Sequence, residues 1–392
     1  MLMTAVLCLI TLFTGCWDKK ELNEIAIILA LGLDKDRNTN ELIFSSQVVN
    51  PQALQPEKGS NTFTTDIITT RGKDILDARK EISKKFDRYP FYSHNRVIII
   101  SEYLAMNDFR PILDRLVRSN EVRPLDWIII AKGVSPEELL KVKHGMSQIQ
   151  AFYLNDIIKQ RNQHSEANVT YLQQFVEDFL SDGINPTAGV MEVIPNTPSY
   201  SSSAQTPTTG EIKLTGLAVF KKTQLLGYLS DRETTAINFI IGKIKKATFS
   251  FPSPTETGKV LSIHINRVRS KINPEKYPDG YTFNIKVDIA GHLGEQQDKS
   301  DISLPKTIES LQTALNEAVE KEIRLAVNKL QNDLQADILG FGSAVSRKYP
   351  KDWKSIKGHW EDMFPNVKYT LTINSRISRT ELLKKTLNIE VK

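Results

Sequence analysis

Residues 305–339 read PKTIESLQTALNEAVEKEIRLAVNKLQNDLQADIL and form the longest regular pattern in the chain. Apolar side chains recur every three or four positions along it, at Ile308, Leu311, Leu315, Val319, Ile323, Val327, Leu330, Leu334 and Ile338. This spacing predicts one amphipathic helix about 50 Å long, at 1.5 Å per residue. Gly340 and Gly342 follow it and are expected to end it. Such a helix normally packs across a sheet of its own domain; a coiled coil with a partner is the alternative.

The segments around this helix have the patterns of strands. Short apolar runs, some alternating with a period of two, make strand candidates of residues 214–220, 225–229, 260–268, 281–290 and 369–377. The first two are close enough to predict a hairpin. Ser230 and Glu233 then have the spacing of a capping box, which predicts a helix running to about Ile241.

The N-terminal part alternates short buried strands with amphipathic helices. The strand candidates are residues 27–33, 42–49, 96–101 and 127–132. The helix candidates, with apolar residues at helical spacing, are residues 72–87, 109–117 and 136–142. The last begins at a capping box of Ser135 and Glu138, with Pro136 at the first helical position. The alternation predicts a parallel or mixed sheet, so the expected fold class is mixed α/β, or α+β, with mixed sheets and one long C-terminal helix.

The chain is long enough for two or three domains, at 392 residues. Residues 195–210, PNTPSYSSSAQTPTTG, are rich in Pro, Ser and Thr and cannot bury much apolar surface. We interpret them as a linker, with a surface loop inside one domain as the alternative. The predicted units are an N-terminal α/β domain (17–194), a small middle domain (211–260), and a C-terminal domain (261–392) carrying the long helix.

The composition is that of a folded globular protein, with 40% hydrophobic and 25% charged residues. Fifty-one Lys and Arg nearly balance 46 Asp and Glu, and the net charge is +5. Clustered basic residues interleaved with aromatic ones would indicate nucleic-acid binding, and the chain lacks that pattern. The surplus lies late, with eleven basic and five acidic residues in 340–392. A solvated basic face explains it, and contact with anionic lipid headgroups is the alternative.

Residues 1–16, MLMTAVLCLITLFTGC, are apolar and uncharged and stop at Asp18. The run is short for a transmembrane helix but suits a signal peptide at residues 1–15. Its end resembles the lipobox of bacterial lipoproteins, so Cys16 is the predicted lipidation site. Two departures are Phe13, where Leu is usual, and the lack of Lys or Arg before the apolar run. An ordinary signal peptide or a buried helix is the alternative. Two acyl chains on Cys16 would give stable membrane anchoring.

The body of the chain carries no recognisable catalytic pattern. Cys8 and Cys16 are the only cysteines, so a body disulfide, a Cys zinc site and a Cys nucleophile are excluded. The motifs HExxH, GxSxG and GxxxxGK[ST] do not occur. Single histidines stand at 94, 144, 164, 264, 292 and 359, and adjacent acidic pairs such as Glu137-Glu138 are typical of exposed helix starts. We therefore expect no enzyme activity, no cofactor and no metal site.

Gly15-Cys16-Trp17-Asp18 begins a series of short matches to a known family. Further matches, in order along the chain, are Glu21-Leu22-Asn23, Gly32-Leu33-Asp34, Ser93-His94, residues 97–102, Arg123-Pro124, Trp127, Ala131-Lys132-Gly133, residues 216–221, Gly227, Glu233-Thr234, Gly340-Phe341-Gly342, Pro350, Trp353, Trp360 and Phe364-Pro365. In these residues the chain resembles the C-subunit lipoproteins of spore nutrient germinant receptors, the Ger(x)C family. A departure is Thr380-Glu381, where a glycine is expected.

The resemblance implies a three-domain, non-enzymatic lipoprotein on the outer face of the spore inner membrane. It implies two integral-membrane partners, the A-type and B-type receptor subunits, and a bilayer contact through diacylglyceryl Cys16. No ligand-contact residue is carried over. The alternatives are a substrate-binding lipoprotein of an importer, which would show two similar lobes, and a surface hydrolase, which would show convergent His, Asp, Glu or Ser. Trp353, Trp360 and Phe364 are candidates for a docking or membrane-facing patch, with core packing as the alternative.

Overall fold

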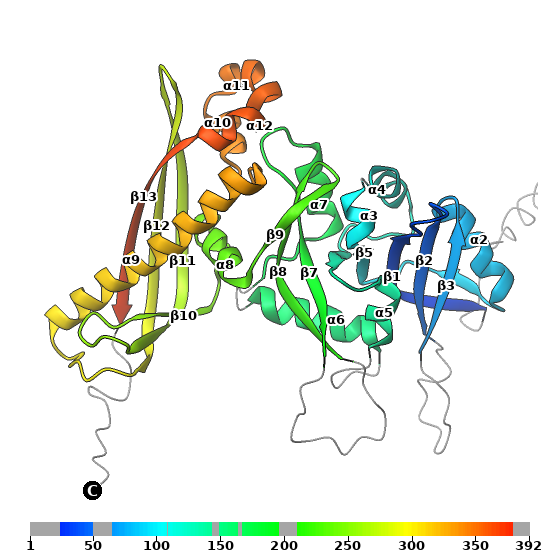
Figure 1. Ribbon diagram of the computed structural model, residues 1–392, viewed down its shortest axis with the longest axis horizontal. Helices are drawn as coiled ribbons and strands as arrows, with labels where there is room; N and C mark the ends of the chain where they lie inside the picture. The colour runs from blue at the N-terminus through cyan, green and yellow to red at the C-terminus, as the bar shows by residue number, and fades with distance from the viewer. Residues whose placement is uncertain are drawn as a thin grey trace, which may run out of the picture.

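The computed structural model describes residues 24–49, 65–107, 109–142, 149–163, 167–195 and 210–378. They form two β-sheets that follow one another along the long axis of the molecule (Figure 1). The first sheet has nine strands in the order β3-β2-β1-β5-β6-β7-β8-β9, with β4 paired to β1, and the second has four in the order β10-β11-β12-β13. Both parallel and antiparallel pairs occur in each sheet, which confirms the predicted mixed fold class.

The strands of the first sheet include every N-terminal strand predicted from the sequence. They are β1 (Ile25–Lys35), β2 (Leu42–Val49), β3 (Thr65–Gly72), β4 (Tyr89–Phe91), β5 (Val97–Ser101), β6 (Trp127–Ala131), β7 (Thr187–Ile194), β8 (Glu211–Lys221) and β9 (Gln224–Leu229). The helices packed on it are α2 (Ile75–Lys85), α3 (Glu102–Met106), α4 (Arg110–Val117), α5 (Pro136–Lys141), α6 (Gln150–Gln163) and α7 (Leu172–Leu180). Of these elements, β3, β4, β7, α3, α6 and α7 had no counterpart in the sequence prediction.

The central strands β5 and β6 show why this sheet needs helices on both faces. Every residue of both strands is buried. Alternate side chains point to opposite faces, so Ile98 and Ile128 pack in the core beneath α2, α4 and α7. Ile99 and Ile129 pack in the opposite core, beneath α5 and α6. Parallel strands that are buried on both faces have this continuous apolar character.

The predicted linker, residues 195–210, connects two neighbouring strands. β7 and β8 pair antiparallel, from Thr187 opposite Val219 to Ile194 opposite Glu211. The sheet thus continues across this segment, as in the surface-loop alternative; residues 196–209 lie outside the described residues. β8 and β9 then form the predicted hairpin. The division into three domains stays a prediction.

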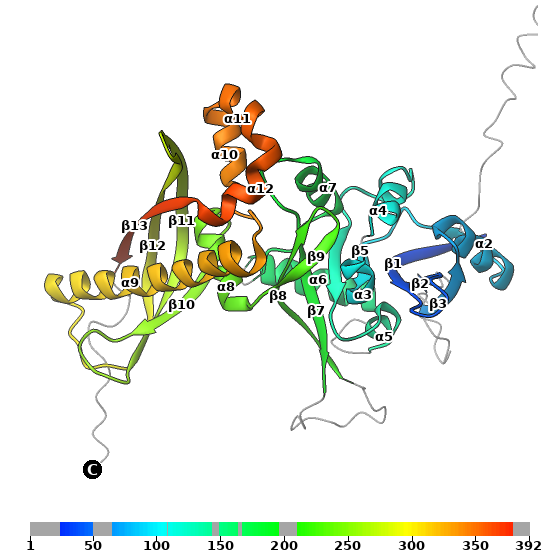
Figure 2. The ribbon, with the colours of Figure 1, turned by 45° about the horizontal axis from the view of Figure 1, so that its top comes forward.

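The second sheet is built around a long hairpin and is covered by the long helix. Its strands are β10 (Ala247–Pro252), β11 (Val260–Tyr277), β12 (Gly280–Gln296) and β13 (Lys368–Ser378), and β13 runs parallel to β12. Helices α8 (Asp231–Ile240) and α9 (Pro305–Lys329) pack on it, and α9 crosses the strands obliquely (Figure 2). This confirms the prediction that the helix packs across a sheet.

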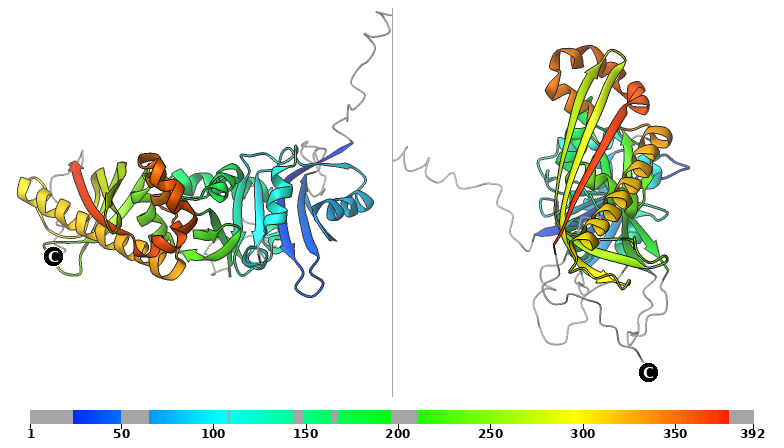
Figure 3. Two further views of the ribbon diagram at one scale, coloured as in Figure 1. Left: turned by 90° about the horizontal axis from the view of Figure 1, so that it is seen from above. Right: turned by 90° about the vertical axis from the view of Figure 1, so that its left-hand side faces the viewer.

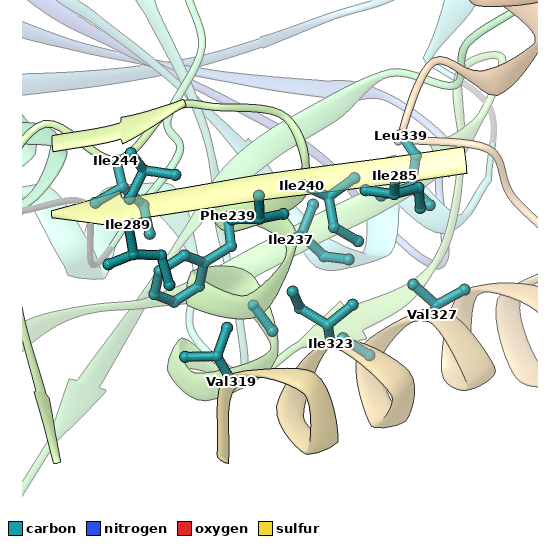
Figure 4. Packing of buried hydrophobic residues seen from close by; sticks show 14 of the residues in the cluster. Ile237, Phe239, Ile240, Ile244, Ile285, Ile289, Val319, Ile323, Val327 and Leu339 are labelled. Atoms are coloured by element: carbon teal, nitrogen blue, oxygen red, sulfur yellow. The ribbon is translucent and has the colours of Figure 1, made fainter. Parts of the chain in front are cut away.

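The apolar stripe of α9 is the main contributor to this second core. Leu311, Leu315, Val319 and Ile323 on α9 are all fully buried. Figure 4 shows Val319 and Ile323 facing Phe239 and Ile240 of α8, with Ile285 and Ile289 of β12 behind them. α8 therefore packs against both the long helix and β12, and one apolar cluster joins all three elements.

The predicted end of the long helix is wrong. Regular α-helix stops at Lys329, a π-helical turn follows over Leu330–Leu334, and Gln335 has a left-handed φ of 49°. The backbone N–H of Asp337 donates to Asn185 Oδ1, 2.8 Å away, and not to a helical carbonyl. Gly340, with φ 74°, precedes the next helix, α10 (Phe341–Lys348), so it is an N-cap and does not end the long helix.

Candidate functional site

The predicted lipidation site lies outside the described residues. Cys16 precedes the first of them, Glu24, and Ile25 begins β1. β1 lies in the half of the molecule opposite the second sheet (Figure 3). Within the described ranges, no helix combines the length and the apolar character needed to cross a bilayer.

Among the described residues, the histidines and paired carboxylates noted in the sequence do not gather at one place. His144 and His164 lie outside the described residues. His264 and His292, which the sequence presented as isolated, are opposite each other on β11 and β12, with ring centroids 5.3 Å apart. Their Nδ1 atoms lie within hydrogen-bond distance of Thr248 and Asn266. In the part of the chain that the structure describes, no group of three His, Cys, Asp or Glu could hold a metal.

The acidic pairs serve local structure. Glu138 and Glu233 complete the two predicted capping boxes, with Ser135 and Ser230 respectively, and both boxes are confirmed. Glu361, next to Asp362, forms an ion pair with Lys221 at 2.9 Å. These carboxylates thus accept hydrogen bonds at helix N-termini or pair with a surface lysine, and both are structural contacts.

A buried aspartate links the two halves of the molecule. Asp337 is 2% exposed, and its carboxylate accepts five N–H donors at 2.8–3.1 Å: the backbone amides of Leu339, Gly340, Phe341 and Gly342, and Trp360 Nε1. The backbone N–H of Asp337 donates to Asn185 Oδ1 at 2.8 Å. The backbone N–H of Asn185 donates to the Asp337 carbonyl at 2.7 Å. Asn185 lies just before β7 of the first sheet. We call Asn185, Asp337, Gly342 and Trp360 the joint.

Close backbone contact reinforces the joint. The backbone N–H of Ser343 donates to the Gly183 carbonyl at 2.9 Å. A Cβ on Gly342 would lie 2.6 Å from Trp360 Nε1 and 2.7 Å from Gly183 Cα, both too short for real contacts. Glycine at 342 is therefore needed for the approach of α10 to the first sheet, and not to end the long helix.

The electrostatics of the joint point to a structural role. Burial raises the pKa of Asp337 to about 6, although hydrogen bonds from Gly342, Phe341, Trp360 and Gly340 act in the opposite direction. Both of its oxygens accept N–H donors, five in all, and such bonds favour the ionised carboxylate. Since it is buried and fully bonded, it holds backbone in place and has no free oxygen for a substrate.

A cavity of about 460 Å³ lies beside the joint, between α7, α8 and the segment 338–343. Its floor includes the apolar side chains of Leu217 and Ile237, and its rim includes Asp178 and Lys243. Burial raises the pKa of Asp178 to about 6, partly offset by a hydrogen bond from Gln174. This cavity is the place where a bound molecule would contact both halves at once.

The C-terminal aromatic residues belong to the core. Trp360 and Phe364 are almost completely buried, and Trp353 is 9% exposed. Phe341 stacks on Phe283 of β12 with centroids 4.2 Å apart, and Trp360 packs edge-on to the same ring. The docking or membrane-facing role for Trp353, Trp360 and Phe364 is therefore wrong, and the core alternative is confirmed.

Sequence reasoning missed the partners of the joint. Gly340 and Gly342 were noticed, but as caps, and neither Asp337 nor Asn185 was singled out. The available signal was an aspartate shortly before a Gly-x-Gly, which is typical of a carboxylate accepting several successive amides. Nothing local to Asn185 indicates a partner 152 residues away.

Two protein-family models match this chain. "Spore germination protein N-terminal domain" matches residues 18–193, and "Spore germination B3/ GerAC like, C-terminal" matches residues 215–381. Spore germination protein KC of Bacillus subtilis (strain 168) is 26% identical over 393 residues, covering 96% of this chain and 95% of that protein. Spore germination proteins B3 and A3 of the same organism are 23% and 22% identical, each covering 93% of both chains.

A solved structure supports the fold. The structure described as the crystal structure of the GerBC protein aligns with a TM-score of 0.58 and 20% identity, covering 92% of this chain and 99% of that one. At this identity the likeness bears on the fold alone. The two family models lie on either side of residues 194–214 and together cover both sheets. The chain therefore belongs to the GerAC-like family of spore germination proteins.

Proposed function

We propose that this protein is the lipid-anchored, non-catalytic subunit of a nutrient germinant receptor on the outer face of the spore inner membrane. The observation that carries the proposal is the match of both halves to relatives named as spore germination proteins, over more than nine-tenths of each chain. The lipobox-like sequence ending in Cys16 supports the anchor, because two acyl chains suffice for stable membrane attachment.

The receptor would contain two integral-membrane partners, the A-type and B-type subunits. In this arrangement the present chain contributes an ectodomain held at the bilayer by diacylglyceryl Cys16. The joint suits that role, because a buried carboxylate with five donors holds the two sheets in one fixed relation. The importer alternative calls for two similar lobes, and sheets of nine and four strands do not favour it.

The test replaces Cys16 in a spore-forming host. Spores carrying the Cys16→Ala variant should lose the protein from the membrane fraction and lose germination in response to amino acids or sugars. Germination by a non-nutrient trigger should be unchanged, since only the receptor is affected. Cys8→Ala is the matched control, because it changes the other cysteine of the apolar segment and should behave as wild type.

Two results would contradict the proposal. If the wild-type protein were found only in the soluble fraction, the proposed lipid anchor would be wrong. The second test uses spores in which every other receptor is deleted. If those spores still germinated normally in response to nutrients after this chain was deleted too, the proposed receptor role would be wrong.

A further inference from the structure

A basic cavity lies at the end of the molecule where the described chain begins. It has a volume of about 550 Å³ and lies between α2 and the C-terminal end of α4. Its lining includes four cations, Arg79, Lys80, Arg115 and Arg118, and one carboxylate, Glu121. We call these four cations and the cavity they line the basic pocket.

The one carboxylate in the lining is already paired. Arg79 Nη2 lies 2.5 Å from Glu121 Oε2, and its guanidinium stacks over the Tyr92 ring, 4.1 Å from the centroid. Arg118 pairs with Asp114 across exposed surface, where an ion pair contributes little. Among the described residues, Lys80 and Arg115 have no ion-pair partner, and Arg115 Nε is buried without any hydrogen-bond acceptor. The lining of the pocket therefore carries more positive than negative charge.

Apolar side chains stand at the mouth of the same pocket. Leu76 and Tyr89 line it, and they are 48% and 43% exposed, respectively. A leucine and a tyrosine in water beside arginine and lysine are typical of a surface at a bilayer interface. There the apolar groups reach the acyl region and the cations remain at the level of the phosphates.

The pocket is also close to the proposed anchor. Tyr89 pairs with Ile25 at the start of β1, and its backbone N–H donates to Glu24 at 2.8 Å. Ile25 lies nine positions after Cys16, and nine steps along an extended chain span at most about 32 Å. In a protein anchored through Cys16, the start of β1, with which Tyr89 of the pocket pairs, would thus lie no further than that from the acylated residue.

We propose that the basic pocket binds the headgroup phosphate of an anionic phospholipid, making a second membrane contact beside the acylated cysteine. The proposal rests on the proposed function for the anchor. The contact would orient the protein on the bilayer, since attachment at one residue alone does not fix the orientation of the ectodomain. It differs from the C-terminal basic surplus noted in the sequence, because α2 and α4 lie in the other half of the molecule (Figure 1).

The experiment measures vesicle binding of the full chain with Cys8→Ser and Cys16→Ser, which removes lipidation. Vesicles of phosphatidylcholine alone are compared with vesicles that also contain phosphatidylglycerol, so binding through residues 1–15 is common to both. The test variant is Lys80→Gln with Arg118→Gln, two exposed residues whose replacement should not affect folding. The matched control is Arg267→Gln with Arg269→Gln, two exposed residues of β11 with the same change in charge.

The expected result is binding that depends on phosphatidylglycerol and becomes about 30-fold weaker in the test variant. This follows because each basic residue at an anionic surface contributes about 1 kcal/mol, and 1.4 kcal/mol is tenfold. The control variant should stay within about twofold of the parent. Equal weakening in both variants would overturn the proposal, because it would reflect net charge alone.

A second measurement examines contact at the mouth of the pocket. The body of the chain contains no cysteine, so Leu76→Cys in the same background can be labelled alone with an environment-sensitive fluorophore. Its emission should shift to the blue on phosphatidylglycerol vesicles, whereas Leu325→Cys on exposed α9 surface should not respond. Calorimetric binding of inorganic phosphate without binding to anionic vesicles would overturn the proposal in favour of a soluble anion. These vesicle results do not depend on the spore experiment, so either idea can fail alone.

Discussion

Asp298 and Asp337 are both buried, and their surroundings move their pKa values in opposite directions. Burial raises the pKa of Asp337 to about 6 because its amide donors do not compensate fully for desolvation. Burial also acts to raise the pKa of Asp298, but hydrogen bonds from Ser253, Ser300 and Gln296 outweigh it and lower the pKa to about 2. Asp298 thereby ties the end of β10 to the segment that leads into α9.

A carboxyl with a lowered pKa in the folded state stabilises the protein above its unfolded pKa, and this contribution is lost in acid. The part of the free energy of unfolding due to Asp298 should therefore fall by on the order of 2 kcal/mol between about pH 4 and pH 2. Urea unfolding at a series of pH values measures it. Asp298→Asn should abolish this part of the pH dependence, and Ser253→Ala should reduce it. An Asp298→Asn variant as acid-sensitive as wild type would contradict the assignment.

At the scale of elements, α10 depends on a contact that leaves no room for a side chain. Gly342 in its first turn lies against Gly183 and the Trp360 indole, and Trp360 in turn donates to Asp337. α11 (Pro350–Ile356) and α12 (Trp360–Met363) follow directly and place Trp353 and Trp360 around this contact. The close contact between Gly342 and Gly183 thus positions α10, α11 and α12 against the first sheet.

Gly342→Ala should lower the free energy of unfolding by about 1–3 kcal/mol, the usual cost of overpacking a core. Gly358→Ala is the matched control, because a Cβ there meets no atom within 4 Å and φ is not positive. It should leave stability unchanged or raise it by up to about 1 kcal/mol. Chemical denaturation of both variants measures this, and equal effects would show that the close contact does not matter.

For the whole molecule, β8 is a strand that contributes side chains to the cores of both sheets. Leu217 and Val219 pack in the core of the second sheet with α8 and α9. Ala218 and Phe220, which alternate with them, pack in the core of the first sheet with α2, α4 and α7. The hydrogen bonds between Asn185 and Asp337 in the joint add a polar connection between the two halves. Two sheets whose cores are joined through one strand in this way should unfold together.

Hydrogen exchange can test this cooperativity. In the wild-type protein, the most protected amides of β6 and β12 should report the same free energy of opening, because both exchange through global unfolding. Asp337→Asn should lower both by about 2–6 kcal/mol, since two N–H donors lose their acceptor at about 1–3 kcal/mol each. Asp182→Asn, an exposed carboxylate nearby, is the control. Wild-type values that differ by several kcal/mol would show that the halves unfold separately.

The features that the sequence determined by itself are those whose physical cause is local. In the runs VIIIS and WIIIA every residue but the last is β-branched or aromatic and favours a strand, and both runs are strands. The capping boxes at Ser135 and Ser230 need only four consecutive residues. The stripe of α9 repeats every turn and predicted both the helix and its packing on a sheet. Polar segments such as β3 carried little of this periodic signal and were missed.

Only the tertiary structure decided where α9 ends, which strands flank residues 195–210, and which groups form the joint and the basic pocket. Each depends on residues that are distant in sequence, such as Asn185 and Asp337 or Arg79 and Glu121. Side-chain periodicity reports burial along one element and cannot report which partner supplies a hydrogen bond. The amide donors of Leu339–Gly342 could have continued a helix, and they turn toward Asp337 because its buried carboxylate needs them.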